Sequence, residues 1–223
     1  MKLGCIVIFF DKLKNRVSAD GIFLGFLLVF YRVLRTIKSN FYGVLLGAKN
    51  LDIGMGCTLK GVKYMKFGTG VSIFRGMWLE AVTYHNGNRY IPKISIGNRA
   101  CFSNNVHVSC IDSVLIGDDV LIGSNVHISD HNHGSYTSID ASSPDEAPAL
   151  RKLVSSGPVV ISEKVWIGDN VNIIGPAFIG AGAIIGSNSV VRGNIDAATI
   201  AVGSPARMIK KYNFVSGNWE RQL

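Results

Sequence analysis

The sequence predicts an all-β solenoid, a parallel β-helix that follows an N-terminal α-helical extension. The first observation behind this prediction is an aliphatic residue at every sixth position, until alanine takes the last slot: Ile161, Ile167, Ile173, Ile179, Ile185, Val191 and Ala197. A period of six fits neither a helix, whose apolar face recurs at about 3.6 residues, nor an isolated strand, which alternates at about 2. It is typical of a hexapeptide β-helix, in which each repeat forms a short strand and a turn.

Two further features of this segment indicate the same fold. The position four after each aliphatic residue is small or branched, as a narrow prism requires: Val165, Val171, Ala177, Ala183, Ser189 and Ile195. Glycine directly follows three of the aliphatic residues, at Gly168, Gly180 and Gly186. There we expect the chain to bend sharply with no Cβ in the way.

The same period recurs upstream and sets the domain organisation. It appears at Ile96, Phe102 and Val108, and then at Ile116, Ile122 and Ile128, two residues out of phase after a bulge at 109–115. It weakens further upstream to Ile53, Phe67, Ile73 and Leu79. Three hexapeptides make one coil, so we expect roughly six coils. The sequence thus divides into a helical segment (1–46), the β-helix (47–205, with a loop insertion at 129–158) and a tail (206–223).

The N-terminal segment is apolar and basic. The chain has a net charge of +8, of which residues 1–38 contribute +5, and the apolar runs at 4–10 and 21–31 are shorter than the roughly 20 residues of a membrane span. The second run continues with interleaved Arg32, Arg35 and Lys38, which predicts a basic amphipathic helix suited to peripheral contact with the inner face of an anionic membrane. The alternative to membrane contact is that this helix packs on the solenoid and covers its open edge. No nucleic-acid recognition motif accompanies the charge.

Polar residues gather where the repeat is interrupted. The insertion at 129–158 begins SDHNHG, and a shorter interruption at 83–92 lies two coils earlier, so the two could wall one cleft. His131 and His133 follow Asp130, which offers a general base beside polar groups that orient it. Solvated surface histidines or a weak metal site are the alternative.

The order of these elements is specific. The repeat, DHNHG, the loop, VWIGDN, the second repeat and GSPAR together resemble the left-handed β-helix, hexapeptide-repeat acyltransferases, in particular the sugar O-acetyltransferases of bacterial lipopolysaccharide, capsule and exopolysaccharide assembly. The resemblance covers about residues 50–212. It implies left-handed coils, a homotrimer with active sites between subunits, acetyl-CoA as co-substrate, no metal, and a cytoplasmic enzyme whose acceptor is a sugar or glycan, free or lipid-linked.

The resemblance also implies roles for individual residues. The family's general base falls on His133, with His131 as the reserve candidate. The acceptor-orienting asparagine of the family falls at Ser103, so this chain departs there, and we keep neighbouring Asn105 as the candidate, with Asn104 beside it. The residues implied for acetyl-CoA are Trp166, Gly168, Asp169, Ser187, Arg207 and Lys210.

The implied reaction is direct transfer. The histidine base takes the proton of a sugar hydroxyl while the oxygen attacks the acetyl thioester, with no acyl-enzyme. An N-acyltransferase acting on an amino sugar or nucleotide-sugar is the nearest alternative. A zinc enzyme of the γ-carbonic-anhydrase type and a non-catalytic scaffold are more distant ones. In the zinc class the last two ligands are five residues apart, whereas His127, His131 and His133 are separated by four, six and two.

Overall fold

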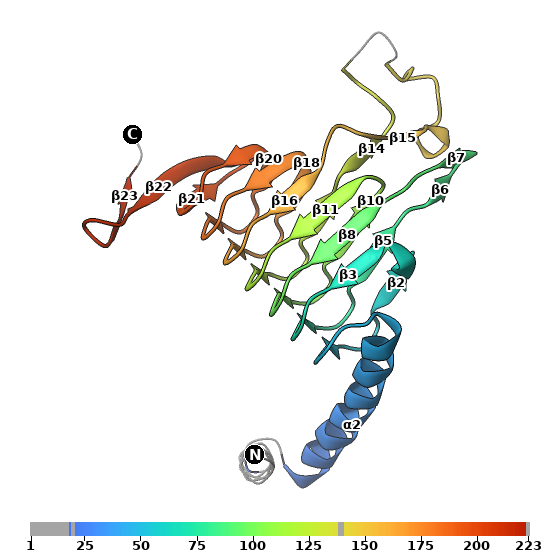
Figure 1. Ribbon diagram of the computed structural model, residues 1–223, viewed down its shortest axis with the longest axis vertical. Coiled ribbons are helices and arrows are strands. Elements are labelled where there is room, and N and C mark those ends of the chain that lie inside the picture. Colours follow the sequence, from blue (N-terminus) through green and yellow to red (C-terminus); the bar gives the residue numbers. More distant parts are fainter. Residues whose placement is uncertain (1–17, 19–20, 138–140, 222–223) are drawn as a thin grey trace.

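Parallel strands stack along one axis and form three ladders in the computed structural model, which describes residues 18, 21–137 and 141–221 (Figure 1). Ladder 1 consists of β1 (Asp52–Ile53), β4 (Ser72–Ile73), β9 (Cys101–Phe102), β12 (Leu121–Ile122), β17 (Trp166–Ile167), β19 (Ile184–Ile185) and β21 (Thr199–Val202). Ladder 2 consists of β2 (Thr58–Lys60), β5 (Trp78–Ala81), β10 (His107–Cys110), β13 (His127–Ser129) and the first parts of β18 (Asn172–Ile179) and β20 (Val190–Ile195).

Ladder 3 completes each coil. It consists of β3 (Met65–Phe67), β8 (Lys93–Ile96), β11 (Ser113–Ile116), β16 (Val159–Ile161) and the last parts of β18 and β20. Strand β18 pairs with β13 at one end and with β16 at the other, so it bends from ladder 2 into ladder 3. At the C-terminal end, β22 (Arg207–Asn213) and β23 (Asn218–Arg221) add antiparallel strands to ladder 1.

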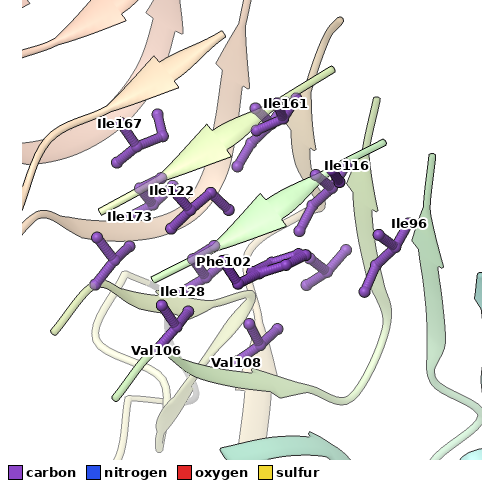
Figure 2. Close-up of a cluster of buried hydrophobic side chains, with 14 of the residues drawn as sticks. Ile96, Phe102, Val106, Val108, Ile116, Ile122, Ile128, Ile161, Ile167 and Ile173 are labelled. Atoms are coloured by element: carbon purple, nitrogen blue, oxygen red, sulfur yellow. The ribbon is translucent and has the colours of Figure 1, made fainter. Parts of the chain in front are cut away.

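The periodic aliphatic residues fill the interior of the coils, as predicted. Figure 2 shows Ile161, Ile167 and Ile173 beside Phe102 and Ile122, all pointing into the same core. The small residues at the fourth position are buried as well: Val165, Val171, Ala177, Ala183, Ser189 and Ile195. Ala197 is exposed, so the strict period of six breaks there, and the inward positions continue out of phase at Ile195 and Ala201, which pair with Ile179 and Ile185.

Glycine and asparagine meet different conformational requirements in the turns. A Cβ on Gly168 would lie 2.7 Å from the backbone nitrogen of Ser187, so glycine is needed because successive coils approach closely. In the turns that lead from ladder 1 into ladder 2, residues with positive φ include Asn105, Asn125 and Asn170, with φ of 56° to 58°. Asparagine tolerates this left-handed conformation better than most side chains. The amides of these three residues also hydrogen-bond from coil to coil, at 3.2 and 3.1 Å.

The predicted helix is α2 (Ile22–Leu45), and its polar residues face the solenoid. Arg35 forms an ion pair with Asp52, at 2.5 and 2.8 Å, and Lys38 donates to the carbonyl of Gly54 at 2.8 Å. The buried hydroxyl of Ser39 accepts the N–H of Ile53 at 2.9 Å, so the helix is fastened to the first coil. Among the described residues, no helix combines the length and apolarity that crossing a bilayer requires.

Removing a core aliphatic residue should destabilise the stack. Ile173 is fully buried between neighbouring coils, and we expect Ile173→Ala to lower the free energy of unfolding by about 3 kcal/mol, because it loses apolar burial and leaves a cavity. The adjacent Ile174 is half-buried on the outer surface, and Ile174→Ala should cost less than half as much. Urea unfolding of both variants checks this, and equal losses would contradict the inward placement of the repeat.

Candidate active site

Both interruptions of the repeat emerge from the same corner, where ladder 2 passes into ladder 3. The hairpin β6 (Tyr84–His85) and β7 (Asn88–Arg89) joins β5 to β8, and the long insertion joins β13 to β16 (Figure 1). One coil lies between them, and its own turn at this corner contains Ile111 and Asp112. The predicted proximity of the two segments is therefore confirmed.

The long insertion is partly ordered into secondary structure. It begins as β14 (His131–His133), which pairs antiparallel with β15 (Leu153–Ser155), and it contains the short helix η2 (Pro148–Leu150). The hairpin contacts it twice: the amide of Asn86 donates to the carbonyl of Ala149 at 2.6 Å, and the hydroxyl of Tyr90 bonds the backbone of Leu153. The two insertions thus form one connected wall.

Asp130 is a fully buried carboxylate at the base of this wall. Its two oxygens accept the backbone N–H groups of the intervening turn, from Ile111 at 3.0 Å and from Asp112 and Ser113 at 2.8 Å each. The thiol of Cys110 donates to it at 3.2 Å. These donors explain the bulge that shifts the repeat at 109–115, because the turn is shaped to surround the carboxylate.

The fifth contact of Asp130 orients a histidine. Its Oδ1 lies 2.8 Å from Nδ1 of His131, whose side chain is only 8% exposed. A carboxylate at Nδ1 favours the tautomer that keeps the proton there and leaves Nε2 as a lone-pair acceptor. Burial alone would raise the pKa of Asp130, but the hydrogen bonds from His131 and from the turn outweigh burial and hold that pKa below its usual value.

His133 lies in a different environment. Its side chain is exposed, and its ring meets His85 of the hairpin edge to face, with centroids 5.4 Å apart. Its carbonyl accepts the hydroxyl of Tyr136 at 2.5 Å. No carboxylate contacts its ring among the described residues, so the structure orients His131 more firmly than His133.

Arg151 braces the far part of the insertion. Its buried guanidinium donates to the hydroxyl of Tyr136 at 2.8 Å and to the carbonyls of Ser143 and Glu146 at 2.9 and 2.7 Å. Sequence reasoning missed this residue and His85, because no local pattern distinguishes them. It named Asp130 only as a polar neighbour of the histidines, although the phase shift at 109–115 marked the turn that surrounds it.

Two more histidines lie on the outer face of ladder 2. His107 packs between Trp78 and His127, with ring centroids 5.0 and 4.9 Å away. Burial lowers the pKa of both histidines, which favours their neutral forms. Within the part of the chain that the structure describes, no three His, Cys, Asp or Glu side chains are grouped so as to hold a metal ion.

The residues predicted for acetyl-CoA gather at another part of the prism. Trp166 is 52% exposed on the outer face of ladder 1, in register with Ile184 of the next coil, and Ile184 is in register with Ile200. At the turn that follows β17, the N–H of Asp169 donates to the hydroxyl of Ser187 at 3.2 Å, and Gly168 lies against the same residue. Trp166, Gly168, Asp169 and Ser187 are therefore brought together.

Basic residues continue this face at its C-terminal end. Lys210 of β22 pairs with Ile200, and Arg207 pairs with Val202, two residues along the same strand. Directly paired residues of a sheet point to the same side, so both basic side chains share the face of Trp166. With strands about 4.8 Å apart, Lys210 lies roughly 14 Å from Trp166 across the sheet. The face therefore passes from apolar to cationic.

Asn105 is not brought to the histidines within one chain. It lies at the turn between β9 and β10, where its amide belongs to the asparagine ladder, and His131 follows the other end of ladder 2. Five residues of extended chain separate Asn105 from Cys110, or about 16 Å. Ser103 and Asn104 lie at the same turn as Asn105. The role of Asn105 stays a prediction.

Sequence comparison shows what parts of this chain are similar to. Residues 158–193 match the family described as "Bacterial transferase hexapeptide (six repeats)". The chain is 45% identical over 117 residues to "Putative lipopolysaccharide biosynthesis O-acetyl transferase WbbJ" of Escherichia coli, a match that covers 52% of this chain and 59% of that protein. The predicted resemblance to hexapeptide-repeat acetyltransferases is confirmed.

Two further comparisons extend this result. "Probable acetyltransferase Rv3034c" of Mycobacterium tuberculosis is 28% identical over 151 residues, covering 65% of this chain and 45% of that protein. The chain thus spans less than two thirds of either curated relative. The N-acyltransferase AntD of Bacillus cereus is similar in structure, with a TM-score of 0.60 at 20% identity over 76% of this chain and 85% of that one. This last likeness supports the β-helix fold alone.

Replacing Asp130 by asparagine should show how much the ionised carboxylate contributes to stability. An amide at position 130 cannot accept from all the surrounding donors, so Asp130→Asn should lower the free energy of unfolding by about 3 kcal/mol at pH 7. Because folding lowers the pKa of Asp130, its stabilisation is complete above the unfolded value of about 3.9 and is lost as the pH falls through the folded value.

Urea unfolding at several pH values measures this difference. The gap between the native protein and Asp130→Asn should be widest near neutral pH and should shrink in acid. Asp145→Asn, at an exposed position of the same insertion, is the control and should leave stability nearly unchanged. A gap that does not depend on pH would contradict an ionised Asp130.

Proposed function

We propose that the protein transfers an acetyl group from acetyl-CoA to a hydroxyl of a sugar during the assembly of a surface polysaccharide, such as O-antigen, capsule or exopolysaccharide. The observation that carries the proposal is the contact between buried Asp130 and Nδ1 of His131, at the start of an insertion in a hexapeptide β-helix. This contact favours His131 as the general base over His133, the reverse of the order that the sequence suggested.

The acetyl group would pass directly from CoA to the acceptor, with no acyl-enzyme. Nε2 of His131 takes the proton of the acceptor hydroxyl while that oxygen bonds to the thioester carbonyl carbon, and the CoA thiolate leaves from the tetrahedral intermediate. Asp130 keeps the imidazole oriented and stabilises the imidazolium that forms, as an anion hydrogen-bonded to Nδ1 does. Tyr136 and Arg151 would shape the acceptor side by ordering the insertion.

Acetyl-CoA fits the face of ladder 1. Trp166 and Ile184 offer an apolar surface to the pantetheine arm, and Gly168, Asp169 and Ser187 line the adjoining turn. Arg207 and Lys210 offer positive charge to the nucleotide phosphates. Structurally similar AntD was crystallised with Coenzyme A and a dTDP-sugar, which agrees with this class of substrate.

A complete site would need two subunits. The histidine wall lies where ladder 2 meets ladder 3, whereas the acetyl-CoA residues lie on ladder 1 and at the turn that follows it. A closed homotrimer would bring the wall of one subunit to ladder 1 of the next. The left-handed sense of the coils, and a cytoplasmic location where acetyl-CoA is made, belong to the same proposal.

The base can be assigned by matched substitutions. His131→Gln should lower kcat for acetyl transfer by two to four orders of magnitude, roughly the contribution of a general base, and leave the Kd for CoA unchanged. His133→Gln should lower it less than about tenfold, because no carboxylate of the described residues contacts that ring. Steady-state kinetics of both variants distinguishes them, and the opposite ranking would move the base to His133.

The acceptor atom can be identified from the chemistry of the product. Purified protein is given radiolabelled acetyl-CoA with extracts of polysaccharide precursors, and the labelled product is treated with mild alkali. An O-acetyl ester should release its acetate, whereas an amide would keep it. Alkali-stable label would establish the N-acyltransferase alternative instead.

The proposed CoA surface can be tested without an acceptor. Trp166→Ala should raise the Kd for CoA about tenfold or more by removing an aromatic wall. Trp78→Ala is the matched control, because Trp78 is similarly exposed but lies on ladder 2 beside His107. Calorimetric titration measures both, and equal effects would argue against ladder 1 as the CoA surface.

A further inference from the structure

Helix α2 is attached to the body of the protein in an unusual orientation. Its hydrogen bonds and ion pair with the first coil involve Arg35, Lys38 and Ser39, and of its large side chains Tyr42 packs against the core. Its large apolar side chains point away instead. Six of them are at least 60% exposed: Phe23, Phe26, Phe30, Ile37, Phe41 and Val44. A helix that met only water would bury this face on the body and expose the polar one.

The apolar surface is broad. At about 100° per residue, the six residues fall within about 60° of one another on one face of the helix, and the half-exposed Leu27, Leu34 and Leu45 widen it to an arc of roughly 100°. Figure 1 shows α2 projecting from the N-terminal end of the solenoid, so that the helix lies beside the coils only near its C-terminal end. Nothing among the described residues packs over the arc.

The charge around this arc has one sign. Residues 21–50 contain Arg32, Arg35, Lys38 and Lys49 and no acidic residue. Asp20 precedes this segment in the sequence, and Asp52, the first carboxylate after it, is paired with Arg35. A helix with phenylalanine and leucine on one side, Arg32 and Arg35 away from that side and Lys38 at its border matches the pattern of helices that lie in the interface of an anionic membrane.

A second copy of the chain fits the same surface less well. A helix that packs only on another helix shows a narrow stripe, and coiled-coil cores favour branched aliphatic residues over phenylalanine. Here Phe23, Phe30 and Phe41 lie near the centre of the arc. The exposed Val33 on one side of it, and Tyr31 and Leu24 on the other, extend the apolar surface beyond such a stripe. These observations favour a lipid surface.

We propose that α2 binds the surface of an anionic phospholipid membrane through this apolar arc and so holds the solenoid beside the bilayer. The interaction does not depend on the reaction proposed above. If that reaction is also correct, membrane binding would bring the enzyme to acceptors that are themselves lipid-linked.

Vesicle sedimentation with the full-length protein, in the absence of acetyl-CoA and acceptor, tests the proposal. The native protein should sediment with vesicles of phosphatidylglycerol and phosphatidylethanolamine, more weakly at high salt, and should bind pure phosphatidylcholine poorly. Phe30→Glu should weaken binding about tenfold or more, because it places a charge at the centre of the arc. Phe26→Ser is a second variant that removes apolar surface without adding charge.

Thr36→Glu is the matched control, since it adds the same charge on the same helix outside the arc and should change binding less than about threefold. Calorimetric titration with CoA and thermal unfolding establish that each variant is folded. Absence of binding to anionic vesicles, or binding that Phe30→Glu and Phe26→Ser leave unchanged, would overturn the proposal. Light scattering that shows a smaller assembly for Phe30→Glu, without vesicle binding by the native protein, would assign the arc to a second copy instead. Vesicle binding does not depend on the outcome of the His131→Gln kinetics. Either proposal can therefore be contradicted without the other.

Discussion

The buried carboxylate of Asp130 is the constraint on which the architecture of the candidate site depends. It accepts three consecutive backbone N–H groups from a turn of one coil, and it contacts His131 in the insertion that leaves the next coil. A charge in this position is stable only because five donors surround it. The same contacts set the bulge in the repeat, the exit direction of the insertion and the orientation of His131.

The solenoid directly holds the residues proposed to bind acetyl-CoA. Its core of stacked aliphatic side chains fixes each turn against the next, so Trp166 and the turn at Ser187 are positioned by regular coils and not by flexible loops. The histidine wall is different, because it depends on side-chain contacts such as those of Arg151 and Tyr90. We expect acceptor preference to vary with that wall and CoA binding to vary little.

Much of the fold could be predicted from the sequence because each strand of a hexapeptide repeat has its own inward aliphatic residue at a fixed spacing. Every inward position from Ile161 to Val191 was identifiable from spacing alone, and so was the end of the repeat at Ala197. The site was less accessible. The contact of Asp130 with the turn at Ile111 joins segments nineteen residues apart, and His85 meets His133 across two coils. No periodic pattern encodes such contacts. The choice between His131 and His133 depended on them, and so did the finding that α2 turns its polar side to the body.

The central claim is that each chain carries two half-sites that are completed by a neighbouring subunit. Mixing subunits of His131→Ala with subunits of Trp166→Ala tests it most directly. The two variants are unfolded together, refolded at equal amounts and assayed at low acetyl-CoA. Random mixing in a trimer should pair an intact histidine wall with an intact ladder 1 at about one quarter of the interfaces, so activity should return to about that fraction of the native value. Activity that stays at the level of the separate variants would contradict a site shared between subunits.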